Sequence, residues 1–163
     1  MNTHALHHST AFGTLPRWLV VGFVSGFVSV LLFHQGAAEL LHAIGLASRA
    51  PYSMEATRPF GVPAFLSLAF WGGVWGVLLA ASLAKLDGPR LIWAATVFGA
   101  VLPTLVAWFV VAPLKGAPMA AGFAPKAMLV GPIVNAAWGL GTGLGLALLG
   151  RPHAEKPLPP QAP

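Results

Sequence analysis

Apolar residues in this sequence gather into four long segments, separated by polar stretches rich in proline and glycine. The segments cover residues 18 to about 46, 63 to about 83, 91 to about 112 and 128 to 149. About twenty apolar residues in a helix cross the roughly 30 Å hydrocarbon core of a bilayer. The pattern therefore predicts an all-α polytopic membrane protein with four transmembrane helices, in a domain covering residues 17–150.

The connections between the segments predict how the helices are arranged. Residues 47–62 and 113–127 are long loops with several prolines, whereas residues 85–90 form a short charged turn that makes its flanking helices antiparallel. Phe70-Trp71-Gly72 in the second segment resembles Ala137-Trp138-Gly139 in the fourth, and each follows a long loop. This internal repeat predicts two tandem helical hairpins in the same orientation.

The two ends of the chain have a different composition. Residues 1–16 are small and polar with no apolar period, and residues 151–163 are polar and rich in proline. Such segments bury too little apolar surface to fold, so we expect disordered tails at both ends. The first apolar segment followed by Gly36-Ala37-Ala38 loosely fits a signal peptide. Its apolar region is long and Arg17 is the positive charge before it, so we expect a retained helix.

Glycines recur at four-residue spacing in three of the predicted helices. This spacing places them on one helix face, where small residues let two backbones approach closely. The pairs are Gly22 and Gly26, Gly72 and Gly76, and Gly139 and Gly143. We expect these faces to be buried between helices. Trp71 and Trp75 lie too deep for an interfacial belt, so we expect both to face protein or a ligand.

Polar side chains interrupt the apolar pattern near the end of the first segment. His34 is followed by Gln35, Glu39 and His42, and on a helix the last three fall within roughly 60° of one another. Polar and ionisable groups are costly at a bilayer, so this cluster is a candidate for function. The fourth segment adds Asn135, which shares a face with Gly139.

The length of the first segment predicts where this cluster lies. Counting from Trp18, Glu39 and His42 reach the headgroup level beside the two long loops. We expect Glu39 to find a cationic or amide partner there. The nearest cationic candidates are Arg49, Arg58 and Lys115. Three interpretations stay open for the cluster: a structural role at the end of a kinked helix, proton or cation handling, and ligand binding.

The sequence supports a metal site or a bound cofactor less well than these interpretations. Glu39 and His42 have the Glu-x-x-His spacing of di-iron bundles, but those sites need a second such pair and two further Glu residues. The other acids, Glu55, Asp87 and Glu155, fall in loops or a tail. The second, third and fourth segments contain no histidine, so bis-histidine haem would have to be shared across a dimer. We therefore predict no metal site and no cofactor, with that shared haem left open.

Composition narrows the class further. Hydrophobic residues make up 56% and charged residues 8%, against about 25% charged in soluble domains. The net charge of +5 is scattered between the apolar segments, so nucleic-acid binding is not expected. The chain contains no cysteine, and it carries no nucleophile–base pair, phosphate loop or zinc motif, so we predict that it is not an enzyme.

The distribution of positive charge predicts the orientation. Five Lys and Arg residues lie near the two ends of the chain and in the 85–90 turn, and four lie in the two long loops. The positive-inside rule then places both termini in the cytoplasm.

Four runs of this sequence resemble known proteins. They are FHQG from Phe33, PFGVPAFLSLAFWGG from Pro59, PTLVAWFVVAPLKG from Pro103 and GPIVNAAWGLGTGL from Gly131. Together with the layout, they resemble a group of small four-helix bacterial inner-membrane proteins without an assigned function. The resemblance implies residence in the bacterial inner membrane and carries no active site with it.

Two functions follow from these patterns. The first is a non-enzymatic integral membrane protein that acts as an accessory subunit or packs with itself. The second is a small oligomeric transporter or proton-coupled carrier that uses Glu39 and the neighbouring histidines. A carrier needs Glu39 or Asn135 to face a water-filled cavity, whereas an accessory subunit leaves them in packing contacts or at the interface.

Overall fold

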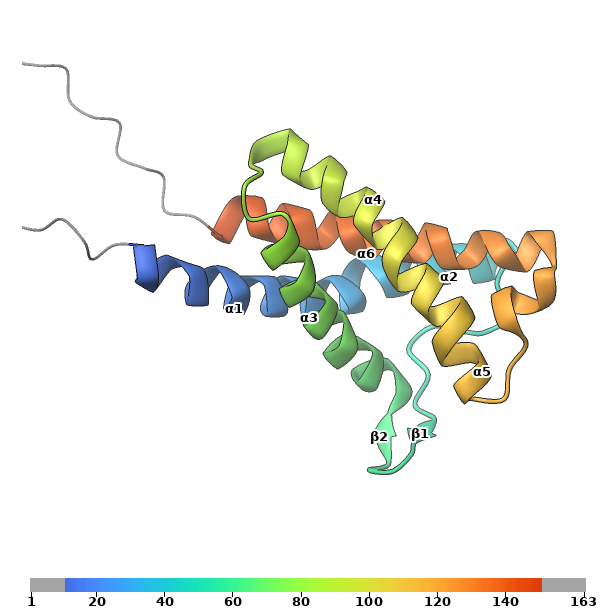
Figure 1. Cartoon of the computed structure of the whole chain (residues 1–163). Helices are drawn as coiled ribbons and strands as arrows, with labels where there is room; N and C mark the ends of the chain where they lie inside the picture. Colours follow the sequence, from blue (N-terminus) through green and yellow to red (C-terminus); the bar gives the residue numbers. More distant parts are fainter. Residues whose placement is uncertain (1–10, 151–163) are drawn as a thin grey trace, which may run out of the picture.

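The computed structural model describes residues 11–150, and most of these are helical (Figure 1). Four helices are long and apolar enough to cross a membrane, namely Leu15–Ala43, Ala64–Ser82, Gly88–Leu114 and Pro125–Leu149. The predicted all-α class with four membrane helices is confirmed. The expected tails at residues 1–10 and 151–163 lie outside the described residues. Residues 11–16 were also expected to be disordered, but the first helix begins at Ala11 and includes them.

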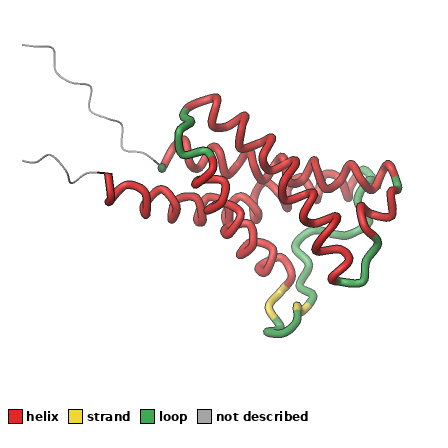
Figure 2. Tube along the Cα trace, in the orientation of Figure 1, coloured by secondary structure: helices red, strands yellow, loops and turns green. Residues whose placement is uncertain are grey.

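The first hairpin of helices contains a change of helix type and a small sheet. Its first helix consists of α1 (Ala11–Ser29), a π-helical segment (Val30–His34) and α2 (Gln35–Ala43). The predicted loop follows and carries two short strands, β1 (Ala56–Thr57) and β2 (Val62–Pro63), which pair antiparallel. Helix α3 (Ala64–Ser82) then returns, and Figure 2 shows how little of the described chain is strand.

The second hairpin also has a first helix that contains a π-helical segment, but its loop, which the structure describes in full, forms no strands. Its first helix consists of α4 (Gly88–Val106), a π-helical segment (Ala107–Val111) and α5 (Ala112–Leu114). A short turn with left-handed backbone, Met119–Phe123, leads into α6 (Pro125–Leu149). Each hairpin thus pairs a first helix that changes to π geometry in its second half with a returning helix that is α-helical throughout.

The helices pack in the order α3, α1, α6, α4. Contacts within the two hairpins, α1 with α3 and α4 with α6, dominate the fold, and α1 with α6 joins them. The short turn makes α3 and α4 consecutive in the sequence, but these two helices make few contacts with each other. Their contact includes Trp75 and Phe98, whose rings meet edge to face at 6.1 Å. The tandem hairpins are therefore the units that pack, rather than the pair joined by the short turn.

Glycines form the seam of the first hairpin. A Cβ placed on Gly22 would lie 2.7 Å from the Gly76 carbonyl oxygen, and one on Gly26 would collide with the carbonyl of Gly72. All four glycines are buried. The backbones of α1 and α3 therefore touch directly, which only residues without a side chain permit.

The glycines of α6 serve two neighbours at once. A Cβ on Gly139 would meet the Ala95 carbonyl of α4, and one on Gly143 would lie 2.8 Å from the Ala95 Cβ. On the other side, a Cβ on Gly141 would meet Ser29 of α1, and one on Gly145 would lie 2.7 Å from the Ser25 Cβ. Residues two apart on a helix point in nearly opposite directions. The alternating glycines thus let α6 pack closely between α4 and α1.

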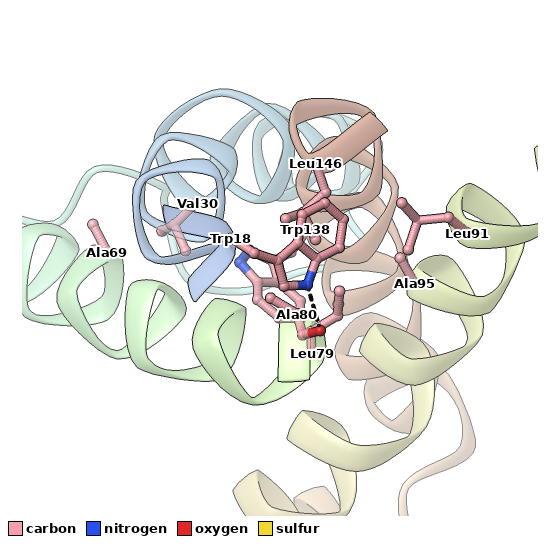
Figure 3. Packing of buried hydrophobic residues seen from close by; sticks show 9 residues of the cluster. All are labelled: Trp18, Val30, Ala69, Leu79, Ala80, Leu91, Ala95, Trp138 and Leu146. Atoms are coloured by element: carbon pink, nitrogen blue, oxygen red, sulfur yellow. Dashed lines mark hydrogen bonds between the residues drawn. The ribbon is translucent and has the colours of Figure 1, made fainter. Parts of the chain in front are cut away.

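The buried apolar cluster lies where the two hairpins meet. Figure 3 shows Trp138 of α6 beside Trp18 of α1, with side chains of α3 and α4 around them. The Trp18 indole donates a 2.7 Å hydrogen bond to the Ala80 carbonyl, drawn as the dashed line. Large aromatic side chains fill the space that the small residues leave between the helices.

Trp71 is more exposed than Trp75. Its side chain is 57% exposed, whereas Trp75 is half-buried. The reason is that α4 meets α3 near the turn that joins them, where Phe98 covers Trp75. Trp71 lies one turn earlier on α3, and its only ring-to-ring contact among the described residues is with the neighbouring Phe70, edge to face. Of the two rings expected to face protein or a ligand, Trp75 is covered by another helix of the described chain and Trp71 is not.

Candidate functional site

In the π-helical segment of the first helix, the backbone carbonyl of Leu31 accepts a hydrogen bond from outside the helix. The N–H of Gln35 bonds to the carbonyls of Val30 and Leu32, and not to that of Leu31. The Leu31 carbonyl instead accepts a 2.7 Å hydrogen bond from the Tyr52 hydroxyl. Because an unpaired carbonyl is costly in an apolar medium, Tyr52 compensates for the change to π geometry.

Tyr52 holds the same region through its backbone. Its N–H donates a 2.9 Å hydrogen bond to Oε1 of Gln35, whose side chain is 5% exposed. Its ring packs edge to face on Phe65 of α3, with 6.2 Å between the centroids. Tyr52 has φ of 50°, an uncommon conformation for a residue with a side chain. The surrounding contacts hold it there, and they join α2, the loop and α3.

His42 fixes the other end of the same loop. Its Nδ1 lies 2.9 Å from the Ala47 carbonyl. A carbonyl oxygen can only accept, so Nδ1 carries the hydrogen in this bond. Gln35 and His42 lie on one face of α2 and hold the chain that follows it, at residues 52 and 47. These two hydrogen bonds hold the loop against α2.

Glu39 lies on the same face, between Gln35 and His42. Its side chain is exposed, and within residues 11–150 no hydrogen bond or ion pair joins it to another residue. Arg49, Arg58 and Lys115 were expected to approach it, and none of them forms an ion pair with it. The carboxylate is therefore free to meet solvent, lipid headgroups or another chain.

His34 differs from its neighbours in having an enclosed nitrogen. The residue ends the π-helical segment, and its Nδ1 is buried without a hydrogen-bond partner among the described residues. The hydroxyl of Ser25, nine residues earlier, shares this property. Unsatisfied polar atoms are uncommon in folded proteins. His34 is therefore the member of the predicted cluster with a buried ring nitrogen that no described contact satisfies.

Asn135 belongs to a different part of the bundle. Its Nδ2 donates a 2.9 Å hydrogen bond to the Thr104 hydroxyl on α4, and Thr104 is buried. The amide therefore joins the two helices of the second hairpin instead of completing the cluster on α2. The structure thus separates the predicted residues into the loop-holding Gln35 and His42, the exposed Glu39, the enclosed His34, and Asn135 in an interhelical pair.

No family model, curated protein or solved structure matches this chain. Within residues 11–150, no group of three or more His, Asp and Glu residues could hold a metal ion. The arrangement offers hydrogen bonds and packing surfaces in place of a preformed ligand cage.

Two residues that the sequence did not mark as site residues carry much of the polar structure. One is Tyr52, and the only signal for it was a single tyrosine in a loop of breakers. The other is Trp138, whose indole donates to the Gly26 carbonyl at 2.9 Å. The Trp138 carbonyl in turn accepts the hydroxyls of Ser29 at 2.6 Å and Thr142 at 2.8 Å. The internal repeat included Trp138 without indicating these bonds.

Proposed function

We propose that this chain is a non-enzymatic multi-pass membrane protein that serves as an accessory or self-associating subunit of a membrane assembly. The observation that carries the proposal is the bond between Asn135 and Thr104. Asn135 is the strongest polar group in the middle of the fourth helix, and it is one of the two residues, with Glu39, that a carrier could turn toward a passage. Its amide is instead committed to packing within the second hairpin.

The other interior polar groups support the same conclusion. Ser29, Thr142 and the Trp138 indole all bond to backbone carbonyls of neighbouring turns or helices. Glycine seams bring the helices into direct backbone contact. A bundle closed by such contacts is suited to rigid packing with other helices, whereas alternating access requires parts that move against each other.

We propose the bacterial inner membrane as its location, with both termini in the cytoplasm. The described ends of the chain and the turn between α3 and α4 lie at one end of the molecule, and the two longer loops lie at the other (Figure 1). The slight excess of Lys and Arg in the sequence, five against four, includes Arg151 and Lys156 beyond the described residues, and it favours the cytoplasmic side for the chain ends and this turn.

A proton-coupled carrier is the second candidate. The buried and unpartnered Nδ1 of His34 favours it, because histidine is the side chain that exchanges protons most readily near neutral pH. Glu39 and His42 follow on the same helix and reach the exposed end of α2. On this proposal the three residues would pass a proton along α2 in an oligomer.

One pair of measurements separates the two candidates. The full chain, tagged at its C-terminus, is extracted in a gentle detergent and recovered for mass spectrometry and mass determination. A stoichiometric membrane partner supports the accessory subunit, and a defined homo-oligomer is compatible with both candidates. The purified chain is also reconstituted into liposomes that hold a pH gradient. Dissipation of the gradient by the chain alone, whether or not it forms an oligomer, would overturn the subunit and support the carrier.

A further inference from the structure

The hairpin of β1 and β2 presents a closed and well-defined tip. Ala56 pairs with Pro63 and Thr57 with Val62. The Gly61 N–H donates a 2.7 Å hydrogen bond to the Thr57 carbonyl, and the Thr57 hydroxyl donates one of 2.8 Å to the Val62 carbonyl. These bonds close the turn and fix the side chains at its tip.

The tip combines an exposed aromatic ring with an unpaired positive charge. Phe60 is 86% exposed, more than any other large apolar side chain that the structure describes. Arg58 is exposed two residues before it, and in the described part of the chain no acidic residue forms an ion pair with it. Nothing within the bundle accounts for either side chain.

The position of the hairpin follows from α3. This helix begins directly after β2 and has 19 residues, so it is about 28 Å long. Figure 1 shows it running obliquely to α1 and α6, so it crosses a thickness smaller than its own length. A hydrocarbon core of about 30 Å therefore reaches the start of α3. The hairpin attached there lies at the boundary between acyl chains and headgroups.

The direction of the hairpin agrees with this depth. In Figure 1 it leaves the bundle sideways, and along the direction of α1 and α6 it does not extend past the ends of α2 and α6. A loop that stood out in water would extend past those ends. The tip is thus placed beside the bundle, where the lipids of one leaflet would surround it.

We propose that residues 56–63 form a lipid-docking hairpin in the leaflet that faces the two longer loops. Phe60 enters the acyl boundary, where an aromatic ring gains from burial. The Arg58 guanidinium binds the phosphate of an anionic phospholipid, since its planar donors match phosphate oxygens. One apolar and one cationic contact on the same rigid tip are the two elements of interfacial binding. The proposal does not depend on which assembly the chain joins.

The absence of cysteine from the sequence makes the depth of the tip measurable. The full chain with Phe60→Cys, carrying a nitroxide label, is reconstituted into phosphatidylcholine vesicles with and without phosphatidylglycerol. Ser48→Cys, at an exposed position of the same loop, is the matched control. The label at position 60 should collide more with oxygen than with a water-soluble nickel chelate, and the label at position 48 should show the reverse. Equal nickel accessibility at both positions would place the tip in water, free for a protein partner, and would overturn the proposal.

The role of Arg58 is tested in the same vesicles. Phosphatidylglycerol should move the label at position 60 deeper, and Arg58→Gln should abolish that shift. Arg49→Gln removes another exposed charge of the same loop and should leave the shift unchanged. An equal loss in both variants, or no shift with the native arginines, would overturn specific phosphate binding by Arg58.

Discussion

The indole nitrogen of Trp138 on α6 lies 2.9 Å from the backbone carbonyl oxygen of Gly26 on α1. Two glycines make this approach possible. Gly26 exposes its own carbonyl, and a Cβ on Gly72 of α3 would lie 3.2 Å from the same nitrogen. The Trp138 side chain of α6 therefore contacts both α1 and α3 at the point where the two hairpins meet. This relationship explains why Trp138 is 2% exposed while Trp71, its counterpart in the internal repeat, faces outward.

Replacing Trp138 with phenylalanine should destabilise the bundle. The variant removes the donor to Gly26 and leaves a gap among α1, α3 and α6, and losses of this kind cost about 1–3 kcal/mol. Thermal unfolding in detergent, followed by circular dichroism, measures the effect. Trp71→Phe is the matched control, because an exposed ring should change stability by less than about 0.5 kcal/mol. Equal effects of the two variants would contradict the central position of Trp138.

Adding a single methyl group at Gly26 should be harmful. Gly26→Ala places a Cβ against the Gly72 carbonyl, and overpacking of this kind costs about 1–3 kcal/mol. Gly36→Ala is the control, because no atom lies within 4 Å of a Cβ at that position. In α2 the alanine should even stabilise, by up to about 1 kcal/mol, through its better helix propensity. The same unfolding measurement tests both, and a neutral Gly26→Ala would place the seam elsewhere.

The sequence predicted the fold more fully than the site. The length of the apolar segments predicted the four helices. Glycines four residues apart predicted the close contact between α1 and α3. Both patterns depend on local spacing in the sequence. The π-helical segment at Val30–His34 could not be predicted in this way. One of its carbonyls accepts the hydroxyl of Tyr52, which lies many residues later in the chain.

Helical spacing also explains what was predicted of the polar cluster and what was not. It correctly placed Gln35, Glu39 and His42 on one face of α2. It could not show that the following loop would cover Gln35 and leave Glu39 exposed, because that depends on how the loop returns. In the sequence Asn135 is another polar residue in an apolar segment, like the cluster on α2. Its hydrogen-bond partner, Thr104, lies on another helix and could not be identified from helical spacing.

Removal of the Tyr52 hydroxyl should loosen the loop while leaving the helices in place. Tyr52→Phe keeps the ring on Phe65 but leaves the Leu31 carbonyl without this partner, at a cost of about 1 kcal/mol. Hydrogen exchange of residues 44–55 in detergent should become faster, since local opening needs less free energy. Residues 115–124, at the same end of the molecule, serve as the internal control and should not change. Unaltered exchange in residues 44–55 would show that Tyr52 does not hold the loop.

The orientation can be tested by reporter fusion in a bacterial host. Fusions after residue 88, in the turn between α3 and α4, and at the C-terminus should both report the cytoplasm. A fusion after residue 54, in the first long loop, should report the opposite side. The expectation rests on the distribution of Lys and Arg and on the arrangement of the ends in Figure 1. A periplasmic signal at either of the first two positions would invert the topology.

Glu39 offers the clearest test between the two proposed functions. Its carboxylate is exposed and makes no hydrogen bond or ion pair with any residue that the structure describes. Glu39→Gln keeps the shape of the side chain, so the free energy of unfolding should change by less than about 0.5 kcal/mol. As a subunit, the chain should leave a pH gradient across liposomes intact, with or without this change. Glu55→Gln removes another exposed carboxylate, from the loop, and is the matched control. If the native chain dissipates the gradient, and Glu39→Gln alone abolishes this while the fold stays intact, then Glu39 carries protons and the subunit proposal is wrong.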